Sequence, residues 1–307
     1  MRGRKHLVSL LAALIASIIF GFSFMFSKIG LQIAAPSVML AFRFTAAFLA
    51  MTVIAGINAA VGKIRGKPLF AFSLRGKPIG TLILLGMIQP VFYFVCENYG
   101  IIYTSASVAG TIIAVVPVTC ILMDVFVMHQ QVRRRQVLCA LCCVLGVALI
   151  GWGGETHISG LGLLFLILTL LCDTFYYVFS HQVARSCNAF EVTYIMFTVG
   201  MVVFIPVALI SGAGHMAQTF LPAVHSAAFW SAVLYLGVIS SIGGYMLLNF
   251  ANAELRVSEA SLFSNVTTVV SLLAGVLLLK EPFGVAQTVG VIIILACVYI
   301  ANMPAKK

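Results

Sequence analysis

The chain has 307 residues, of which 62% are hydrophobic and only 8% are charged. Soluble domains carry about 25% charged residues, so 18 basic and 8 acidic side chains cannot cover a protein of this size in water. The composition therefore excludes a soluble globular protein and indicates an integral membrane protein. The net charge of +10 would suggest nucleic-acid binding in a soluble protein, but basic loops on the cytoplasmic side of a membrane explain it here. We therefore exclude nucleic acid as a partner.

Apolar stretches long enough to cross a bilayer, about 20 residues each, recur along the chain. They predict an all-α protein with ten transmembrane helices at residues 7–27, 37–58, 79–100, 104–127, 137–153, 161–181, 190–211, 227–250, 259–279 and 285–303. The first stretch follows basic residues, as a secretory signal does. Its apolar run is too long for a signal and no small-residue cleavage site follows it, so we expect it to remain as a helix.

The basic residues predict how this chain is oriented. With the N-terminus in the cytoplasm, fifteen of the 18 fall in cytoplasmic segments: Arg2, Arg4, Lys5, Lys63, Arg65, Lys67, Arg75, Lys77, Arg133, Arg134, Arg135, Arg185, Arg256, Lys306 and Lys307. The outer loops hold only Lys28 and Lys280. We therefore expect both termini to be cytoplasmic, in the plasma membrane of a bacterium. The basic and aromatic loop 59–78 is typical of a segment lying on anionic headgroups, or of a flexible basic loop.

The two halves of the chain resemble each other at a nearly constant offset. Phe26-Ser27-Lys28 recurs 153 residues later as Phe179-Ser180-His181, and Asn98-Tyr99 recurs 151 residues later as Asn249-Phe250. We therefore expect two five-helix repeats, at residues 1–153 and 154–307. Because five is odd, the second repeat enters the membrane from the other side, which is the inverted architecture of alternating-access carriers.

Short motifs resemble those of the drug/metabolite transporter superfamily, in particular its EamA-type ten-helix carriers. They are Phe20-Gly21-Phe22-Ser23-Phe24 near the end of the first span, Arg43-Phe44 in the second, and Leu277-Leu278-Leu279-Lys280-Glu281 with Gln287 and Gly290 at the end of the second repeat. The first repeat has Gln130 where the second has Glu281, and the second has Thr268 where the first has Pro117. The resemblance implies efflux of amino acids, related metabolites or toxic organic compounds.

Three ionisable residues lie well inside predicted spans, away from the inner ends, where charge is costly and usually functional. Asp173 lies near the middle of its span, and we predict that it binds a proton or a cation; a protonated carboxyl bonded to a neighbouring helix is the alternative. Glu97 and Arg43 lie at similar depth near the outer ends of their spans. They are predicted to form an ion pair, either as an outer gate or as a permanent brace.

Breaks in the middle of spans favour a binding site, because unwound backbone offers polar groups to a substrate. Gln89-Pro90 interrupts the third span, and Ser240-Ser241 with Gly243-Gly244 interrupts the eighth. The predicted substrate-binding residues around these breaks are Gln89, Tyr93, Asn98, Asp173, Tyr177, Tyr245, Asn249 and Asn265. The aromatic members are equally consistent with helix packing.

These features favour a secondary carrier that moves a small molecule by alternating access, with protons as candidate coupling ions and no cofactor. No nucleotide-binding motif is present in the sequence, so the chain alone does not use ATP. An exchanger of nucleotide sugars or phosphate esters is the alternative carrier, but Arg43 is the only basic residue well inside a span. A channel or membrane scaffold is the alternative of another class. An enzyme is disfavoured because no set of catalytic residue types lies at one depth in the membrane. The motif of Cys139, Cys142 and Cys143 does not predict a metal site.

Overall fold

A computed structural model of the chain describes residues 2–68, 70–128, 134–152, 159–255 and 257–302. The described residues form helices and connecting loops, with no strand among them. In chain order the helical segments are α1 (Arg2–Leu31), α2 (Pro36–Arg65), α3 (Ile79–Gly86), η1 (Met87–Phe92), α4 (Tyr93–Tyr103), α5 (Ala106–Ile112), η2 (Ile113–Val115), α6 (Val116–Met128), α7 (Arg134–Trp152), α8 (Gly160–Val183), α9 (Ala189–Ser211), α10 (Met216–Val224), α11 (Ala227–Leu234), η3 (Tyr235–Gly244), α12 (Tyr245–Glu254), α13 (Val257–Ala260), η4 (Ser261–Phe263), α14 (Ser264–Leu273), η5 (Ala274–Leu278) and α15 (Val285–Asn302).

The ten predicted spans correspond to ten helical stretches of the described chain, and α10 is an additional short helix. Eight stretches within the described residues are long and apolar enough to cross a membrane by length and composition. The other two are α7, which begins with two arginines, and α15, whose described apolar part is the shorter Val285–Cys297. These two helices pack against each other. The predicted boundary between the repeats, at residues 153 and 154, lies outside the described residues.

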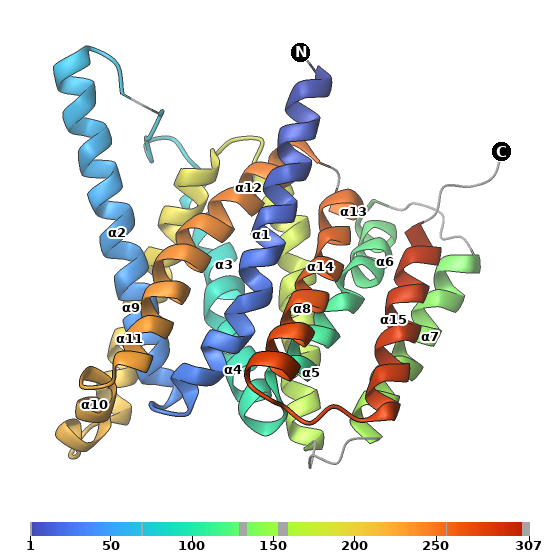
Figure 1. Ribbon diagram of the computed structural model, residues 1–307. Coiled ribbons are helices and arrows are strands. Elements are labelled where there is room, and N and C mark those ends of the chain that lie inside the picture. Colours follow the sequence, from blue (N-terminus) through green and yellow to red (C-terminus); the bar gives the residue numbers. More distant parts are fainter. Residues whose placement is uncertain (1, 69, 129–133, 153–158, 256, 303–307) are drawn as a thin grey trace.

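The helices run in alternating directions, and the two halves are inverted (Figure 1). The first helix, α1, runs downward in this view, whereas α8, the first helix of the second half, runs upward. The last helix, α15, also runs upward, so the start of α1 and the end of α15 lie on one side. We call that side the terminal face and the other side the opposite face.

Packing between the halves follows a pseudo-twofold symmetry. Helix α1 packs on α12 and α14 of the second half, and its counterpart α8 packs on α4 and α6 of the first half. The pairs α2 with α9 and α7 with α15 join helices that are counterparts of each other. Each contact of one repeat on the other is therefore repeated with the roles exchanged, which is what a twofold axis between inverted repeats requires.

Individual contacts obey the same symmetry. Lys28 Nζ donates a hydrogen bond to the Ile101 carbonyl oxygen at 3.3 Å on the opposite face, and Nδ1 of His181 lies 2.7 Å from the Asn252 carbonyl oxygen on the terminal face. His181 follows Lys28 by 153 residues, and Asn252 follows Ile101 by 151. The same offsets that relate the sequences thus relate the contacts.

Glycines permit the closest helix contacts, again in counterpart positions. A Cβ atom on Gly86 of α3 would lie 3.0 Å from Cβ of Val199 on α9, and one on Gly237 of η3 would lie 3.0 Å from Cβ of Ala46 on α2. At the opposite face, a Cβ on Gly110 would overlap the side chain of Ser271 on α14. Small residues bring helices of the two repeats into close contact without a side chain between them.

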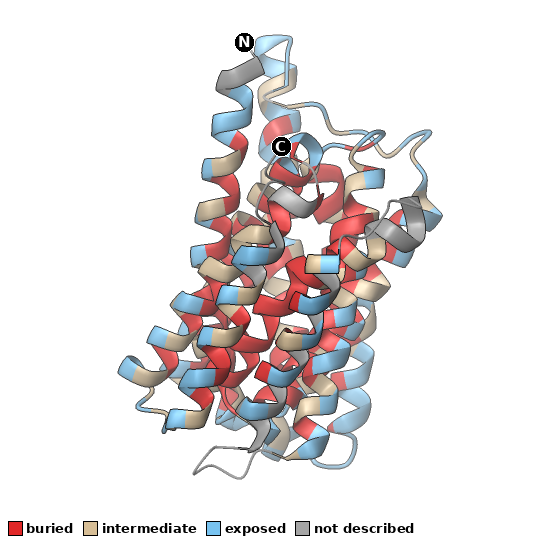
Figure 2. Cartoon of the chain, turned by 90° about the vertical axis from the view of Figure 1, so that its right-hand side faces the viewer, coloured by how far each residue is buried: buried red, intermediate tan, exposed pale blue. Residues whose placement is uncertain are grey.

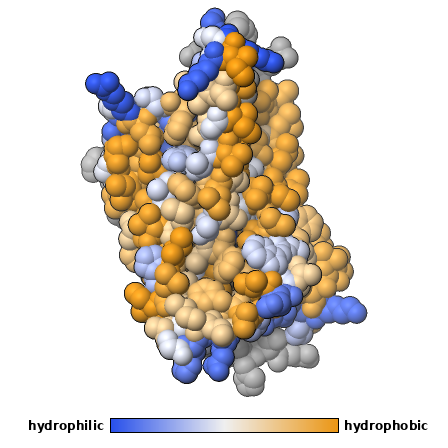
Figure 3. Space-filling model, turned by 90° about the vertical axis from the view of Figure 1, so that its left-hand side faces the viewer, coloured by the Kyte–Doolittle hydropathy of each residue, from blue (hydrophilic) through white to orange (hydrophobic). Residues whose placement is uncertain are grey.

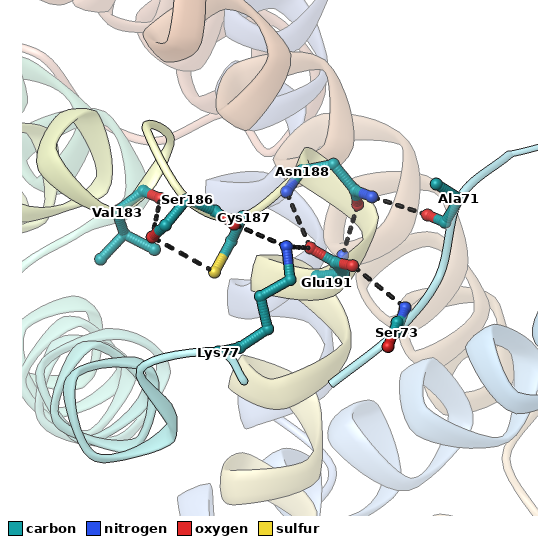
Figure 4. Close-up of polar contacts among 8 residues, drawn as sticks. All are labelled: Ala71, Ser73, Lys77, Val183, Ser186, Cys187, Asn188 and Glu191. Atoms are coloured by element: carbon teal, nitrogen blue, oxygen red, sulfur yellow. Dashed lines mark hydrogen bonds and ion pairs between the residues drawn. The ribbon is translucent and has the colours of Figure 1, made fainter. Parts of the chain in front are cut away.

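The loop 66–78 on the terminal face is tied to the start of α9 (Figure 4). Asn188 and Glu191 form a capping box there, in which each side chain accepts a hydrogen bond from the backbone N–H of the other residue. Glu191 also forms an ion pair with Lys77 at 3.0 Å and accepts a hydrogen bond from the Ser73 N–H at 3.1 Å. Asn188 donates to the Ala71 carbonyl oxygen at 2.6 Å.

Aromatic side chains fix the same loop. The Phe70 and Phe72 rings lie 4.6 Å and 5.1 Å from the Phe190 ring, measured between centroids, and Phe72 also contacts Tyr194. Residues 70–78 therefore form a strap across α9 rather than a free loop. The basic residues Arg65, Lys67 and Arg75 remain exposed, and their contact with anionic headgroups stays a prediction.

The outer surface suits lipid. Buried residues gather between the helices and exposed ones lie outside (Figure 2). On the face formed largely by α2, hydrophobic side chains cover the middle, and hydrophilic ones gather at the two ends (Figure 3). Leu49 and Val53 of α2 are more than half exposed. Because lipid solvates such side chains, burial of apolar area gives little driving force for helix association, and close packing and hydrogen bonds between helices matter more.

Replacing Gly110 with alanine is expected to lower the melting temperature of the purified protein, because the added methyl group must displace Ser271. Overpacking of this kind costs about 1–3 kcal/mol. Gly56→Ala is the matched control, since nothing lies within 4 Å of a Cβ at that helical position. Thermal unfolding of both variants in the same detergent gives the measurement, and equal melting temperatures would contradict the tight contact between the helices that carry Gly110 and Ser271.

Candidate functional site

A narrow cavity of about 40 Å³ lies between helices of both repeats. Its lining consists of Phe20, Ser23, Phe24, Arg43, Gln89, Tyr93, Phe94, Glu97, Ile113, Asp173, Tyr177, Ser240, Tyr245, Leu248, Ser264 and Thr267. The lining combines six aromatic rings with a few polar groups, which is the usual composition of a small-molecule site.

The cavity lies on the pseudo-twofold axis. Twelve of its sixteen lining residues are counterparts of each other at the offsets of 153 and 151. The six pairs are Phe20 with Asp173, Phe24 with Tyr177, Gln89 with Ser240, Phe94 with Tyr245, Glu97 with Leu248, and Ile113 with Ser264. Both repeats therefore contribute the same helix positions to the cavity, as expected for a site between inverted repeats.

The charges in this symmetric frame are not symmetric. Asp173 has Phe20 as its counterpart, and Glu97 has Leu248. Arg43 lies on α2, whose first residue Pro36 precedes the first residue of α9 by 153, so its counterpart is the buried Met196. Each charged group therefore occurs in one repeat only. The scaffold is shared between the repeats, whereas the electrostatic character of the cavity is particular to each half.

Arg43 is fully buried, and its guanidinium group is held from two directions. Nε donates a hydrogen bond to Ser241 Oγ at 3.3 Å, and Cζ lies 3.9 Å from the centre of the Phe94 ring. Nη1 and Nη2 have no hydrogen-bond partner among the described residues. These two nitrogens are the free donors of a group that lines the cavity.

Glu97 faces the same cavity without pairing with Arg43. Its Oε1 accepts a hydrogen bond from the Tyr93 hydroxyl at 3.4 Å, and its Oε2 has no partner among the described residues. The two groups share the cavity, but no ion pair joins them among the described residues. The predicted ion pair of Arg43 and Glu97 is therefore not formed in this conformation.

Asp173 lies in the cavity on α8, close to the break in the third span. The backbone of Gln89 departs from helical geometry at φ −142° and ψ 114°, inside the π-helical segment η1. Its carboxamide donates to the Tyr245 hydroxyl, and its Oε1 has no partner among the described residues. At the counterpart position, Ser240 and Ser241 of the eighth span lie in the π-helical segment η3, which continues the helix without a break.

Five of the eight predicted substrate-binding residues line the cavity, namely Gln89, Tyr93, Asp173, Tyr177 and Tyr245. The three asparagines lie outside its lining. Asn249 accepts a hydrogen bond from the Tyr176 hydroxyl at 2.7 Å and donates to Thr193 Oγ1 at 3.0 Å, so it joins three helices. Its counterpart Asn98 is fully buried with no partner for either side-chain atom among the described residues, and Asn265 is half-buried on α14.

The lining also contains residues that the motifs did not single out as binding residues, including Ser23, Phe94, Leu248 and Ser264. The repeat offset is a signal that finds several of them. Phe94 is the counterpart of Tyr245, and Leu248 is the counterpart of Glu97. A cavity residue predicted in one half therefore identifies the corresponding residue of the other half as a candidate. Ser23 is found only in the structure, where its hydroxyl donates to Ser240 Oγ at 2.7 Å.

An all-helical membrane protein whose inverted halves share a central cavity has the architecture of a transporter. Comparison with known proteins agrees with that class. The EamA-like transporter family matches residues 7–152 and again residues 160–303, and the chain belongs to this family. It is therefore a multi-pass membrane transporter of the drug/metabolite transporter superfamily, and not an enzyme.

Several relatives are similar along most of their length. The uncharacterized transporter YcxC of Bacillus subtilis is 31% identical over 302 residues, which are 97% of this chain and 93% of the relative. An uncharacterized transporter of Archaeoglobus fulgidus is 23% identical over 85% of this chain and 91% of the relative. Protein PecM of Dickeya dadantii is 24% identical over 77% of this chain and 83% of its own. A solved crystal structure shares the fold, with a TM-score of 0.63 over 96% of both chains at 19% identity.

The two counterpart asparagines are expected to respond in opposite ways to substitution with leucine. Asn249→Leu leaves the buried Tyr176 hydroxyl without its acceptor, and an unsatisfied buried polar group costs about 1–3 kcal/mol. The melting temperature should fall. Asn98→Leu removes a carboxamide that has no partner among the described residues, so the melting temperature should stay the same or rise. Equal losses in both variants would show that Asn98 is bonded as firmly as Asn249.

Proposed function

We propose that this transporter is a secondary carrier that exports a small amphipathic solute, an amino acid or a close relative, by alternating access. The observation that carries the proposal is the chemistry of the central cavity. One guanidinium group and two carboxyl groups line it together with six aromatic rings. A solute with an anionic group, a cationic group and an apolar side chain meets a complementary partner for each part.

Charge balance favours a zwitterion over a phosphate ester. Arg43 provides the cavity's only guanidinium or ammonium group, whereas Glu97 and Asp173 each provide a carboxyl group. A phosphate dianion usually needs several fixed cations or bidentate arginines, and two carboxyl groups would repel it. A zwitterion brings no net charge into a site surrounded by lipid, where uncompensated charge is costly. The nucleotide-sugar or phosphate-ester exchanger is therefore less well supported.

The symmetric frame supports alternating access. Because the same helix positions of both repeats line the cavity, the two repeats can exchange roles as the cavity opens to one side and then to the other. Asp173 is the proposed coupling residue, since it lies in the cavity beside the helix break at Gln89. In this proposal the terminal face is cytoplasmic, as the basic strap and the positive-inside rule favour.

A thermal-shift screen of the purified protein tests the substrate class. L-Phenylalanine and L-leucine are expected to stabilise the protein, and sugar phosphates are not. Hits are then tested for saturable flux in proteoliposomes. Strong stabilisation by a phosphate ester would contradict the proposed substrate, and flux that does not saturate would favour a channel.

Replacing Asp173 with asparagine is expected to abolish acceleration of flux by a pH gradient, because the carboxyl group that takes the proton is gone. Exchange of labelled for unlabelled substrate should continue, since it needs no net proton movement. Glu254→Gln is the matched control, because Glu254 is an exposed carboxyl group at the end of α12. Flux with and without a pH gradient in proteoliposomes measures the effect, and unchanged acceleration in the Asp173 variant would exclude its coupling role.

A further inference from the structure

Arg43 contacts the eighth span at two positions that lie one helical turn apart. Gly237 lies where a Cβ atom would come within 2.8 Å of the Arg43 carbonyl oxygen, so the backbones of η3 and α2 touch there. One turn further along η3, the Ser241 hydroxyl accepts the hydrogen bond from Arg43 Nε. Ser241 is fully buried and does not line the cavity. Its hydroxyl group therefore acts on the cavity only through the guanidinium group.

The face of the guanidinium group is fixed as well. Cζ lies 3.9 Å from the centre of the Phe94 ring, close enough for a cation–π interaction, and Phe94 in turn packs against Tyr93 and Tyr245. With Nε bonded to Ser241 and one face covered by Phe94, the rotation of the group about its long axis is restricted. Nη1 and Nη2, which have no partner among the described residues, form the one free edge of the fork.

A free fork edge is the part of arginine that binds a carboxylate in bidentate fashion. Glu97 lines the same cavity, but its carboxyl group forms no ion pair with Arg43 in the described structure. Both groups thus keep unpartnered polar atoms, Nη1 and Nη2 on one and Oε2 on the other. Leaving such buried atoms unsatisfied is costly, which is the pattern expected of a site that a ligand completes.

The repeat symmetry indicates that the arginine and the serine belong together. The counterpart of Arg43 is Met196, and the counterpart of Ser241, 151 residues earlier, is Pro90. The second occurrence of this helix contact therefore has neither the cation nor the hydroxyl group. A hydroxyl group needed only for helix packing would have no reason to occur solely where the cation does.

We infer that Ser241 is a positioning residue that turns the free edge of Arg43 toward the carboxylate of the substrate, and so sets the preference for carboxylate-bearing solutes. This inference rests on the proposed function, because it assigns one half of the zwitterion to Arg43. The ammonium group of the substrate is left to the carboxyl groups of the cavity. Ser241 itself touches no substrate.

Ligand pairs that differ only in the carboxylate test this inference. L-Phenylalanine carries both charges, whereas phenethylamine lacks the carboxylate and retains the ammonium group and the ring. In Ser241→Ala, the affinity for L-phenylalanine should fall about tenfold, as expected for loss of a hydrogen bond to a charged group. The affinity for phenethylamine should not change. Isothermal titration of the purified protein in detergent measures both.

Two further variants separate positioning from folding. Ser241→Thr keeps the hydroxyl group and should retain the preference for L-phenylalanine. Ser231→Ala is the matched control, because Ser231 lies at the other end of the same span, is exposed, and donates only to the Ala228 carbonyl oxygen. Equal loss of affinity for both ligands in Ser241→Ala would overturn the inference and leave the proposed function standing. If the wild-type protein binds neither ligand, the proposed function fails and this inference fails with it.

Discussion

Lipid offers no hydrogen bonds, so a polar group placed at depth is costly unless it finds a partner inside the protein or in a ligand. The rest of the structure depends on this constraint. The break at Gln89 and the π-helical segment η3 lie where other helices cover them, and Gln89, Ser240 and Ser241 are buried. Non-helical backbone is tolerated in a membrane only in such places or around a cavity. Here both conditions meet, because Gln89 and its counterpart Ser240 both line the same cavity.

The residues that obey the repeat symmetry differ in kind from those that depart from it. Glycine contacts such as Gly86 with Val199 and Gly237 with Ala46 recur in both halves and give the repeats the same packing. Two conformations that exchange these contacts would be close in energy, and a carrier needs such a balance in order to switch with modest binding energy. The charged residues depart from the symmetry. They define a direction across the cavity, with the cation on α2 and carboxyl groups on α4 and α8. In the proposed function this direction orients the solute within a nearly symmetric frame.

The sequence predicted how far along its span a residue lies better than it predicted which neighbouring helix the side chain faces. Spans, helix breaks and the repeat follow from hydropathy and spacing, and the position of Asp173 within its span was enough to predict an intramembrane carboxyl group that the structure places in the cavity. Which neighbour a side chain faces depends on the rotation of its helix, and one residue turns the direction by about 100°. Glu97 and Arg43 therefore both line the cavity without pairing, and the adjacent Asn98 lies outside its lining. Asn249 binds Tyr176 and Thr193 because of tertiary packing that no local pattern encodes.

A contact at the end of the second repeat has no charged counterpart in the first repeat. On the opposite face, the Glu281 carboxylate accepts hydrogen bonds from the backbone N–H groups of Ala106 and Ser107, both at 2.9 Å, and from Ser107 Oγ at 2.6 Å. A carboxylate at a helix N-terminus satisfies free donors and interacts favourably with the helix dipole. The corresponding residue of the first repeat is Gln130, which lies outside the described residues and whose neutral carboxamide has a single acceptor oxygen. In the proposed cycle, opening the opposite face requires this charged contact to break, whereas the counterpart position of the first repeat has a neutral side chain. This difference adds to the unequal charges of the cavity, so the two ends of the protein are not equivalent in the proposed cycle.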